Sequence, residues 1–155
     1  ILSLIGEIMQ SVEPAEKTGL DGVFSELAES LPRRGLVIVI SDLFAPREEI
    51  ASGLQAFSLR GHDVIVFHVL DETELTFPFE GNTLFNGLED YPEINADPRQ
   101  LQEAYVEVFE EYLQEIERIA STGGFDYQRS LTSDPLDAAV VSLIAARAKL
   151  RRIRR

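Results

Sequence analysis

Two uninterrupted apolar runs, separated by a segment of helix length, constrain this chain more than any other feature. The runs Leu36–Ile40 (LVIVI) and Asp63–Leu70 (DVIVFHVL) are rich in β-branched residues, as are strands of a parallel sheet covered on both faces. Between them, residues 46–59 start with Pro46, which suits the first turn of a helix, and carry apolar residues at helical spacing. Two buried strands joined by one helix form a βαβ unit, so we expect parallel strands and a right-handed connection.

Further periodic segments extend this unit in both directions. Apolar spacing and the capping signals Asp97, Pro98 and Gly123-Gly124 set the limits of the expected elements. The predicted helices cover residues 1–12, 20–31, 46–59, 98–120 and a segment after Pro135, and a third strand covers residues 125–131. The expected fold is α/β, a doubly wound and mainly parallel sheet of Rossmann type, in a single domain over residues 1–155.

After the second strand, the spacing of apolar residues changes. Residues 75–79 (LTFPF) alternate as a strand does, with Pro78 favouring an edge position. Residues 80–82 read as a turn, and residues 83–88 can return as the partner strand. We therefore expect a small β-hairpin insertion over about residues 74–90.

Charge is distributed unevenly along the chain. The net charge is −13, yet residues 147–155 (RAKLRRIRR, the basic tail) hold six of the fourteen basic residues and no acidic one. The rest of the chain therefore carries a net charge of −19, which repels phosphate backbones and argues against nucleic-acid binding. The tail can contact an acidic membrane surface or RNA, or its cations can complement the dipole of the last helix and stay solvated.

The sequence lacks the residues and motifs that several classes of functional site require. The chain has no cysteine, which excludes disulfides, thiolate metal sites and cysteine nucleophiles, and it has no glycine-rich phosphate loop or G-x-S-x-G elbow. With two histidines, a zinc site is not expected, and His68 is expected to be a hydrogen-bonded core residue. No signal peptide or membrane span is evident, and we expect a cytoplasmic protein. The start, ILSLIGEIMQ, indicates a chain truncated at its N-terminus.

The candidate site lies where the two apolar strands end. In doubly wound sheets, ligands bind beyond the carboxyl ends of the strands, and Asp42, with Ser41 and Asp71 as secondary candidates, is placed there. Mg²⁺ is held by one or two carboxylates with other oxygen ligands, which these side chains could supply. The alternative is that Ser41 or Asp42 only caps the loop before Pro46.

Three other polar groups each allow two interpretations. Thr18, in KTGLDG, can form a variant capping box with Asp21, or it can ligate a metal. Asp71 and Glu74 can pair as carboxylates or belong to a solvated turn. The glutamates of the long helix over 98–120 form a face that is either solvated or directed at a partner.

The segments TGLDGVFSEL, RRGLVIVISD and GHDVIVFHVLDETE, followed by a tyrosine-containing helix and a short strand before SDP, together resemble a known family. They are similar to the carboxyl-terminal portion of the bacterial domain-of-unknown-function fifty-eight proteins. That resemblance implies a von Willebrand factor A-like domain, which often accompanies a MoxR-type AAA+ ATPase.

The resemblance also implies a partial metal site. A-type domains hold a cation with an Asp-x-Ser-x-Ser loop, a threonine and an aspartate. Thr18 matches the threonine and Asp42 the aspartate, but the Asp-x-Ser-x-Ser loop is absent from residues 1–155. The expected cation is Mg²⁺ or Mn²⁺, bound in the intact protein and weakly or not at all in this chain.

The function implied is a non-enzymatic protein-interaction module, in which a cation grips a partner's acidic group and an AAA+ ATPase is the partner. The alternatives are a structural domain that has lost its metal site, and a metal-dependent hydrolase using Asp42 and Asp71. In a truncated A-type domain, the strand over 36–41 has a bare edge. We expect that edge to pair with a second copy as a homodimer or to be covered by the helix over 1–12. The full-length protein could also be held at a membrane.

Overall fold

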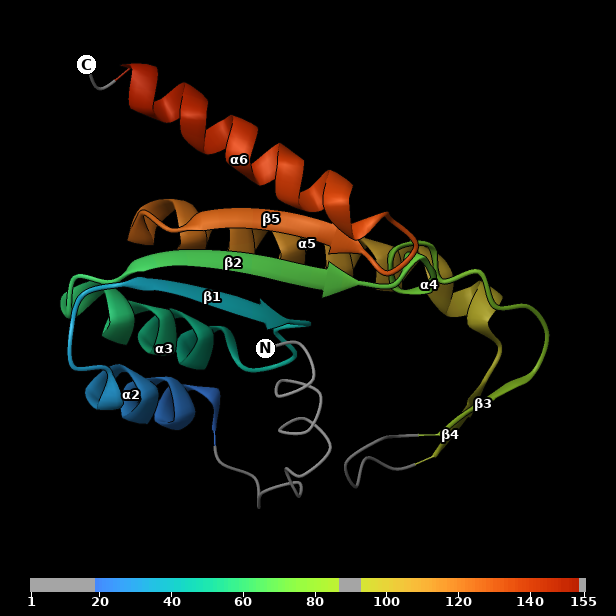
Figure 1. Ribbon diagram of the computed structural model, residues 1–155. Coiled ribbons are helices and arrows are strands. Elements are labelled where there is room, and N and C mark those ends of the chain that lie inside the picture. Colours follow the sequence, from blue (N-terminus) through green and yellow to red (C-terminus); the bar gives the residue numbers. More distant parts are fainter. Residues whose placement is uncertain (1–18, 87–92, 154–155) are drawn as a thin grey trace, which may run out of the picture.

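Three parallel strands form the centre of the molecule. The computed structural model describes residues 19–86 and 93–153, and the helix predicted over 1–12 lies outside them. Strands β1 (Leu36–Ser41), β2 (Asp63–Leu70) and β5 (Asp126–Leu131) form a sheet in the order β1-β2-β5 (Figure 1). Ile65 of β2 pairs with Ile38 on one side and Asp126 on the other, and both ladders are parallel. The mainly parallel α/β fold is thus confirmed.

Helices cover the two faces of this sheet unequally. Helices α3 (Arg47–Leu59) and α5 (Pro98–Gly123) lie on one face, and α2 (Leu20–Ser30) packs outside α3 (Figure 1). A β-carbon on Gly53 of α3 would come within 2.8 Å of the Phe24 ring, so glycine permits this close approach. Helix α6 (Leu136–Ile153) lies on the other face, beside β5.

The hydrophobic core fills the space between the sheet and α2, α3 and α5. Alternate residues of the strands point into it, because successive side chains of a strand face opposite ways. The helices contribute residues at helical spacing. The buried members are Phe24, Ala28, Val39, Leu43, Ile50, Leu54, Phe57, Val64, Val66 and Ile116.

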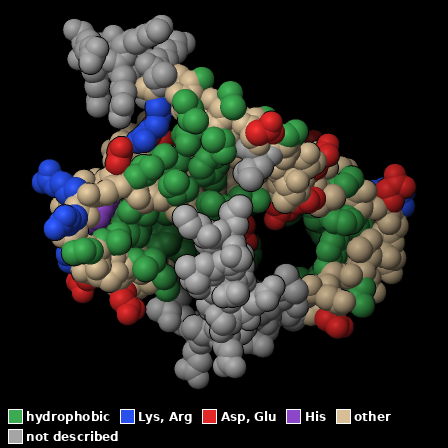
Figure 2. All heavy atoms as spheres, in the orientation of Figure 1, with side chains coloured by type: hydrophobic (Ala, Val, Ile, Leu, Met, Phe, Trp, Pro, Cys, Tyr) green, Lys and Arg blue, Asp and Glu red, His purple; other side chains and the backbone are tan. Residues whose placement is uncertain are grey.

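Within the described residues, the opposite face of β1 is left uncovered, which differs from the predicted strand covered on both faces. Leu36, Ile38 and Ile40 all point to this face, and Ile40 is 71% exposed. Apolar side chains gather over β1 and along α6 in Figure 2. Helix α6 covers β5 but does not reach β1, and β2 is the one strand paired with β1 in the described ranges. In β1, a continuous apolar run is therefore found in a strand with one covered face among the described residues.

Helix α6 runs back against the direction of the strands. Arg147 forms ion pairs with Asp63 and Asp126, the first residues of β2 and β5, and so ties the helix to the amino edge of the sheet. Leu143 of this helix is buried, whereas Val140 and Ile144 are exposed. No helix within 19–86 or 93–153 is both long and apolar enough to cross a membrane.

Basic side chains gather at this amino edge. Arg33 and Arg34 lie just before β1, and Arg60 lies just before β2. Together with Arg147 they place much of the positive charge on the side opposite to the strand carboxyl ends, as blue side chains on the left of Figure 2 indicate.

The limits of the long helix follow the capping signals. The Asp97 side chain accepts a hydrogen bond from the Arg99 amide, and Pro98 is the first helical residue. Gly124 ends α5 with φ 74°, in the left-handed region that glycine adopts without strain.

One strand of the predicted hairpin is present at residues 83–85, but its partner strand is different. Residues 72–76 form a short helix, α4 (Glu72–Thr76), so the strand predicted over 75–79 is wrong. The two-stranded sheet instead joins β3 (Thr83–Phe85) to β4 (Ile94–Ala96), beyond the predicted limit at residue 90. A capping box between Asp71 and Glu74 starts α4, and such a box favours a helix over an extended strand.

Candidate functional site

The first strand ends in a tight, polar turn over residues 41–44. The Leu43 amide donates to Ser41 Oγ at 2.9 Å, and the Phe44 amide donates to Asp42 Oδ1 at 3.2 Å. Both side chains thus bond the loop backbone, as the capping interpretation predicts. Neither caps helix α3, whose N-cap residue is Pro46 and which has no side-chain capping hydrogen bond. Asp42 remains exposed at the carboxyl edge of the sheet.

Leu43 holds this turn in an unusual backbone conformation. Its φ is 53°, in the left-handed region that residues other than glycine rarely adopt, at a cost of about 1–2 kcal/mol. Its side chain is fully buried in the core. Burial of a leucine contributes about 1.5–3 kcal/mol, which offsets the strain.

Two side chains from other elements hold the backbone of the turn. His68 on β2 is fully buried, and its Nε2 lies 2.9 Å from the Asp42 carbonyl oxygen. Because a carbonyl only accepts, Nε2 carries the proton, and Nδ1 accepts from the Tyr127 hydroxyl at 2.8 Å. On α5, the Tyr112 hydroxyl donates to the Leu43 carbonyl oxygen. The prediction that His68 is a hydrogen-bonded core histidine is confirmed.

Burial shifts the pKa of His68 and that of Tyr112. Desolvation lowers the pKa of His68 below 6.5, and the hydrogen bond to the Asp42 carbonyl opposes this only in part. Desolvation, followed by the charge of Asp42, raises the pKa of Tyr112 to about 12. At neutral pH both side chains are therefore uncharged, so His68 Nδ1 can accept from the Tyr127 hydroxyl and the Tyr112 hydroxyl can donate to the turn.

Asp71, at the end of β2, is fully engaged with its neighbours. Its Oδ1 accepts from the amide and hydroxyl of Thr73 at 2.9 and 2.6 Å, and its Oδ2 accepts from the Thr132 hydroxyl at 2.7 Å. These bonds, led by that from the Thr73 hydroxyl, lower the pKa of Asp71 to about 2. Glu74 accepts from the Asp71 amide, so the two carboxylates cap α4 and do not face a common ligand.

Thr18 lies outside the described residues. Two residues farther along the chain, the Leu20 amide donates to Glu49 Oε2 at 3.1 Å, and Glu49 belongs to the first turn of α3. Within the described ranges, no three histidine, aspartate or glutamate side chains group closely enough to hold a metal. Asp42 and Ser41 offer two oxygen donors of the type that Mg²⁺ prefers, so they fit as part of a site.

A second feature of this edge was not found by sequence reasoning. A groove of about 420 Å³, here called the aromatic groove, lies between the loop after the turn and one side of α5. Its lining residues are Phe44, Ala45, Pro46, Arg47, Tyr105, Val108, Phe109 and Tyr112. Tyr105, Val108 and Tyr112 recur at helical spacing, yet Val108 is 61% exposed. The sequence signal that could have indicated the groove is the abundance of tyrosine and phenylalanine on this side of the helix.

The rings form a continuous row beside the groove. Phe77 stacks on Tyr105 with ring centres 4.3 Å apart, and Tyr105 stacks on Phe109 at 5.6 Å. Phe109 continues to Tyr112 at 6.1 Å. The Arg47 guanidinium lies 5.7 Å from the centre of the Tyr112 ring, a cation–π arrangement.

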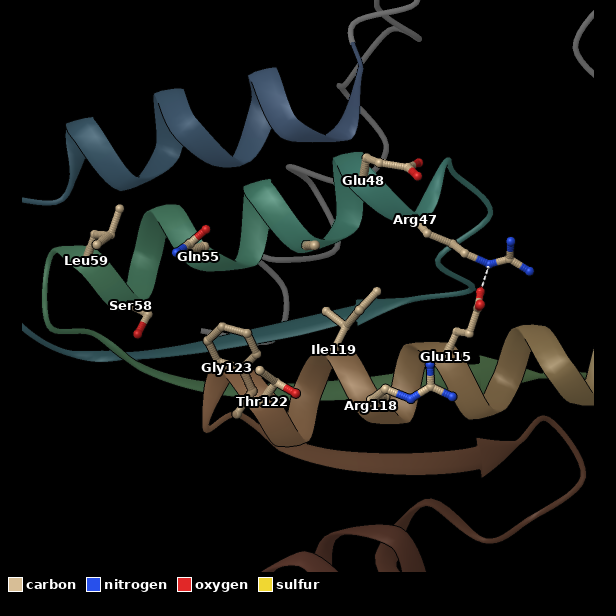
Figure 3. Close-up of a pocket in the computed structure, with 12 residues that line it drawn as sticks. Arg47, Glu48, Gln55, Ser58, Leu59, Glu115, Arg118, Ile119, Thr122 and Gly123 are labelled. Atoms are coloured by element: carbon tan, nitrogen blue, oxygen red, sulfur yellow. Dashed lines mark ion pairs between the residues drawn. The ribbon is translucent and has the colours of Figure 1, made fainter.

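A larger cavity of about 670 Å³ lies between α3 and α5 (Figure 3). Gln55, Ser58 and Thr122 give it a mixed lining with Ile119. Arg47 and Glu115 form an ion pair at one end, drawn as a dashed line in Figure 3. Since Arg47 also lines the aromatic groove, this pair separates the two cavities.

Comparisons with known proteins were made with the sequence and with the fold. A family model described as "Protein of unknown function DUF58" matches residues 1–113. No curated protein matches the chain. A crystal structure described as "conserved hypothetical protein BatB from Bacteroides thetaiotaomicron" is similar, with a TM-score of 0.51 and 20% identity over 95% of this chain and 69% of that one. At this identity, the likeness shows the fold alone.

Proposed function

The chain belongs to the DUF58 family of proteins of unknown function, and we propose that it is a non-enzymatic protein-interaction module. Its binding surface is the carboxyl edge of the parallel sheet, centred on Asp42. Parallel α/β sheets bind ligands at this edge, because the loops that follow the strands meet there.

The observation that carries this proposal is the support given to Asp42. The turn that presents its carboxylate is held by Leu43 in a left-handed conformation, by the buried His68 and by Tyr112. A loop cap alone needs only the local bonds from residues 41–44. Strained backbone that is held by surrounding structure is typical of binding and catalytic sites.

We further propose that the fold is of the von Willebrand A type and that a divalent cation completes the surface. Asp42 would ligate Mg²⁺ or Mn²⁺, with Ser41 beside it and Thr18 as a companion ligand. The remaining ligands would come from a loop outside these 155 residues. A bound cation would supply an open coordination position for a carboxylate of the partner.

A MoxR-type AAA+ ATPase is the proposed partner, in assembly or chaperone-like work. Support comes from the resemblance of RRGLVIVISD and GHDVIVFHVLDETE to proteins that accompany such ATPases. A hydrolase is less favoured, because both oxygens of Asp71 already accept hydrogen bonds, from Thr73 at the start of α4 and from Thr132.

Calorimetric titration with Mg²⁺ and Mn²⁺ tests the cation, on this chain and on one extended upstream of Ile1. We expect saturable binding by the extended chain that Asp42→Ala removes. Glu103→Gln, which changes an exposed carboxylate of α5, is the matched control and should leave binding unchanged. Binding that survives Asp42→Ala would overturn the assignment.

A pull-down with the purified ATPase, with and without EDTA, then tests the interaction. We expect capture that Asp42→Ala weakens and that EDTA abolishes. Capture that is indifferent to Asp42→Ala would place the interface elsewhere. Cation binding without capture would contradict the proposed partner but not the metal site.

A further inference from the structure

We propose that the aromatic groove binds residues 148–155, the part of the basic tail that follows Arg147, from a second copy of the chain. The proposal goes beyond the cation-dependent surface around Asp42, because it requires no metal. It assigns an occupant to a groove that no other part of the described chain fills, and it assigns a function to the basic tail.

The groove offers flat aromatic faces to its occupant. Tyr105, Phe109 and Tyr112 stack in a row, and Val108 is largely exposed between them. Guanidinium groups bind well to such faces, since a cation is attracted to the ring and the apolar stem of arginine packs on it. Arg47 already makes this contact with Tyr112 within the groove.

Negative charge surrounds these rings. Asp42 and Glu74 act on the two groove tyrosines, where their charges add to burial in raising the pKa of Tyr112 and of Tyr105 respectively. Glu107 and Glu111 are exposed and lie one turn apart on α5, with Glu111 three residues beyond Val108 and so next to it on the helix surface. Arg47, the cation in the lining, is paired with Glu115. The groove therefore favours a cationic, partly apolar segment.

The basic tail has that composition. Residues 148–155 contain five cations, and Leu150 and Ile153 stand among them. No acidic residue interrupts the segment. It complements the groove both in charge and in apolar character.

The tail of the same molecule cannot reach this groove. Arg147 is held at the amino edge by Asp63 and Asp126, whereas the groove begins just after the carboxyl end of β1. The eight residues of β2 separate these edges by about 26 Å, at about 3.3 Å per residue. Helix α6 continues to Ile153 and carries the tail farther away, as Figure 1 shows. The contact is therefore between two molecules, tail to groove.

A labelled peptide of residues 143–155 (LIAARAKLRRIRR), titrated into the full chain in EDTA, tests the proposal by fluorescence anisotropy. We expect saturable binding that Val108→Lys weakens about tenfold or more, because the new cation repels the peptide in the groove. The matched control is Val141→Lys on α6, since Val141 is 64% exposed and lies outside the groove, and it should change the affinity less than twofold.

Two further arms separate docking from general charge attraction. The same peptide with Leu150→Ser and Ile153→Ser keeps all its cations and should bind several-fold more weakly. Raising the salt from 50 to 300 mM should weaken binding of the original peptide, because screening shortens the range of the charges. Absence of saturable binding would overturn the proposal, as would equal affinity for the Val108→Lys chain or for the serine peptide. The use of EDTA makes these outcomes independent of the cation proposed at Asp42.

Discussion

Asp42 owes its position to side chains that lie far from it in the sequence. His68 holds its carbonyl oxygen, Tyr127 fixes the proton of His68 on the nitrogen that faces the turn, and Tyr112 holds the next carbonyl. Sequence reasoning identified Asp42 because a carboxylate after an apolar strand is a local pattern. It could not identify these supports, because their partners lie 26 to 69 residues away.

The strain at Leu43 gives a first prediction. Replacement of this buried leucine by alanine should lower the free energy of unfolding by about 2–5 kcal/mol. Leu43→Gly should be no more destabilising than Leu43→Ala, because glycine adopts φ 53° without strain. In ordinary strands and helices glycine is the worse of the two by about 0.5–1 kcal/mol. Urea unfolding of both variants measures the difference, and a clearly less stable Leu43→Gly would contradict the strain.

The buried imidazole gives a second prediction, for pH. The pKa of His68 in the folded protein is below its ordinary value of 6.5, so the unfolded chain binds more protons than the folded one as the pH falls. Stability should therefore be full above about pH 7 and should fall as the pH drops through 6.5.

Urea unfolding at pH 7.5 and pH 5.5 measures this dependence. His68→Gln should remove most of it. Tyr127→Phe keeps the imidazole and loses one hydrogen bond, so it should cost about 1 kcal/mol and leave the pH dependence in place. An unchanged slope in His68→Gln would show that other groups are responsible.

At the scale of elements, the parallel unit was predictable and the segment after it was not. The strands β1 and β2 and the helix between them were evident from apolar runs and caps, which are local signals. The prediction for residues 72–86 was wrong because two sequence signals competed there. Alternating apolar residues favoured a strand over 75–79, but the capping box of Asp71 and Glu74 started a helix. The aromatic side chains of this segment then pack on one another and on α5, which no strand pattern encodes.

Capping of α4 gives the third prediction. The Asp71 carboxylate also accepts from Thr132, and so it connects the end of β2 to the residue after β5. With its pKa lowered to about 2 from 3.8, it contributes stability that is present above about pH 4 and is lost as the pH falls toward 2.

Asp71→Asn should therefore lower the stability at pH 7 and reduce the loss between pH 4 and pH 2. Acid unfolding followed by circular dichroism measures both effects, with Glu103→Gln as the exposed control. If Asp71→Asn unfolds in acid with the same midpoint and the same stability at pH 7 as the unchanged chain, the capping role is wrong.

At the scale of the whole molecule, the β1 part of one sheet face is apolar and exposed among residues 19–86 and 93–153. Strand β1 carries no charge, proline or bulge, the devices that usually protect an edge strand. Pairing of residues 36–41 with a second copy thus remains a prediction. It differs from the tail-to-groove contact in its response to salt, because apolar contacts are not weakened by screening.

Ile40→Lys tests the open face. This side chain is 71% exposed, so the change should leave the free energy of unfolding within about 0.5 kcal/mol. It should lower any association that persists at 500 mM salt, as measured by sedimentation velocity. Ile144→Lys on α6, 61% exposed, is the control and should not affect pairing at the β1 edge. Salt-resistant association that Ile40→Lys leaves intact would exclude the β1 edge as its cause.

The antiparallel course of α6 affects how charge is distributed over the protein. By bringing Arg147 to the side where Arg33, Arg34 and Arg60 already lie, it separates charge along the strand direction and so contributes to a permanent dipole moment. A protein with a net charge of −13 would ordinarily be repelled by a cation-exchange resin. This one should be retained by both resin types at low salt, with opposite ends toward the beads, and removal of residues 148–155 should weaken its retention on the cation exchanger.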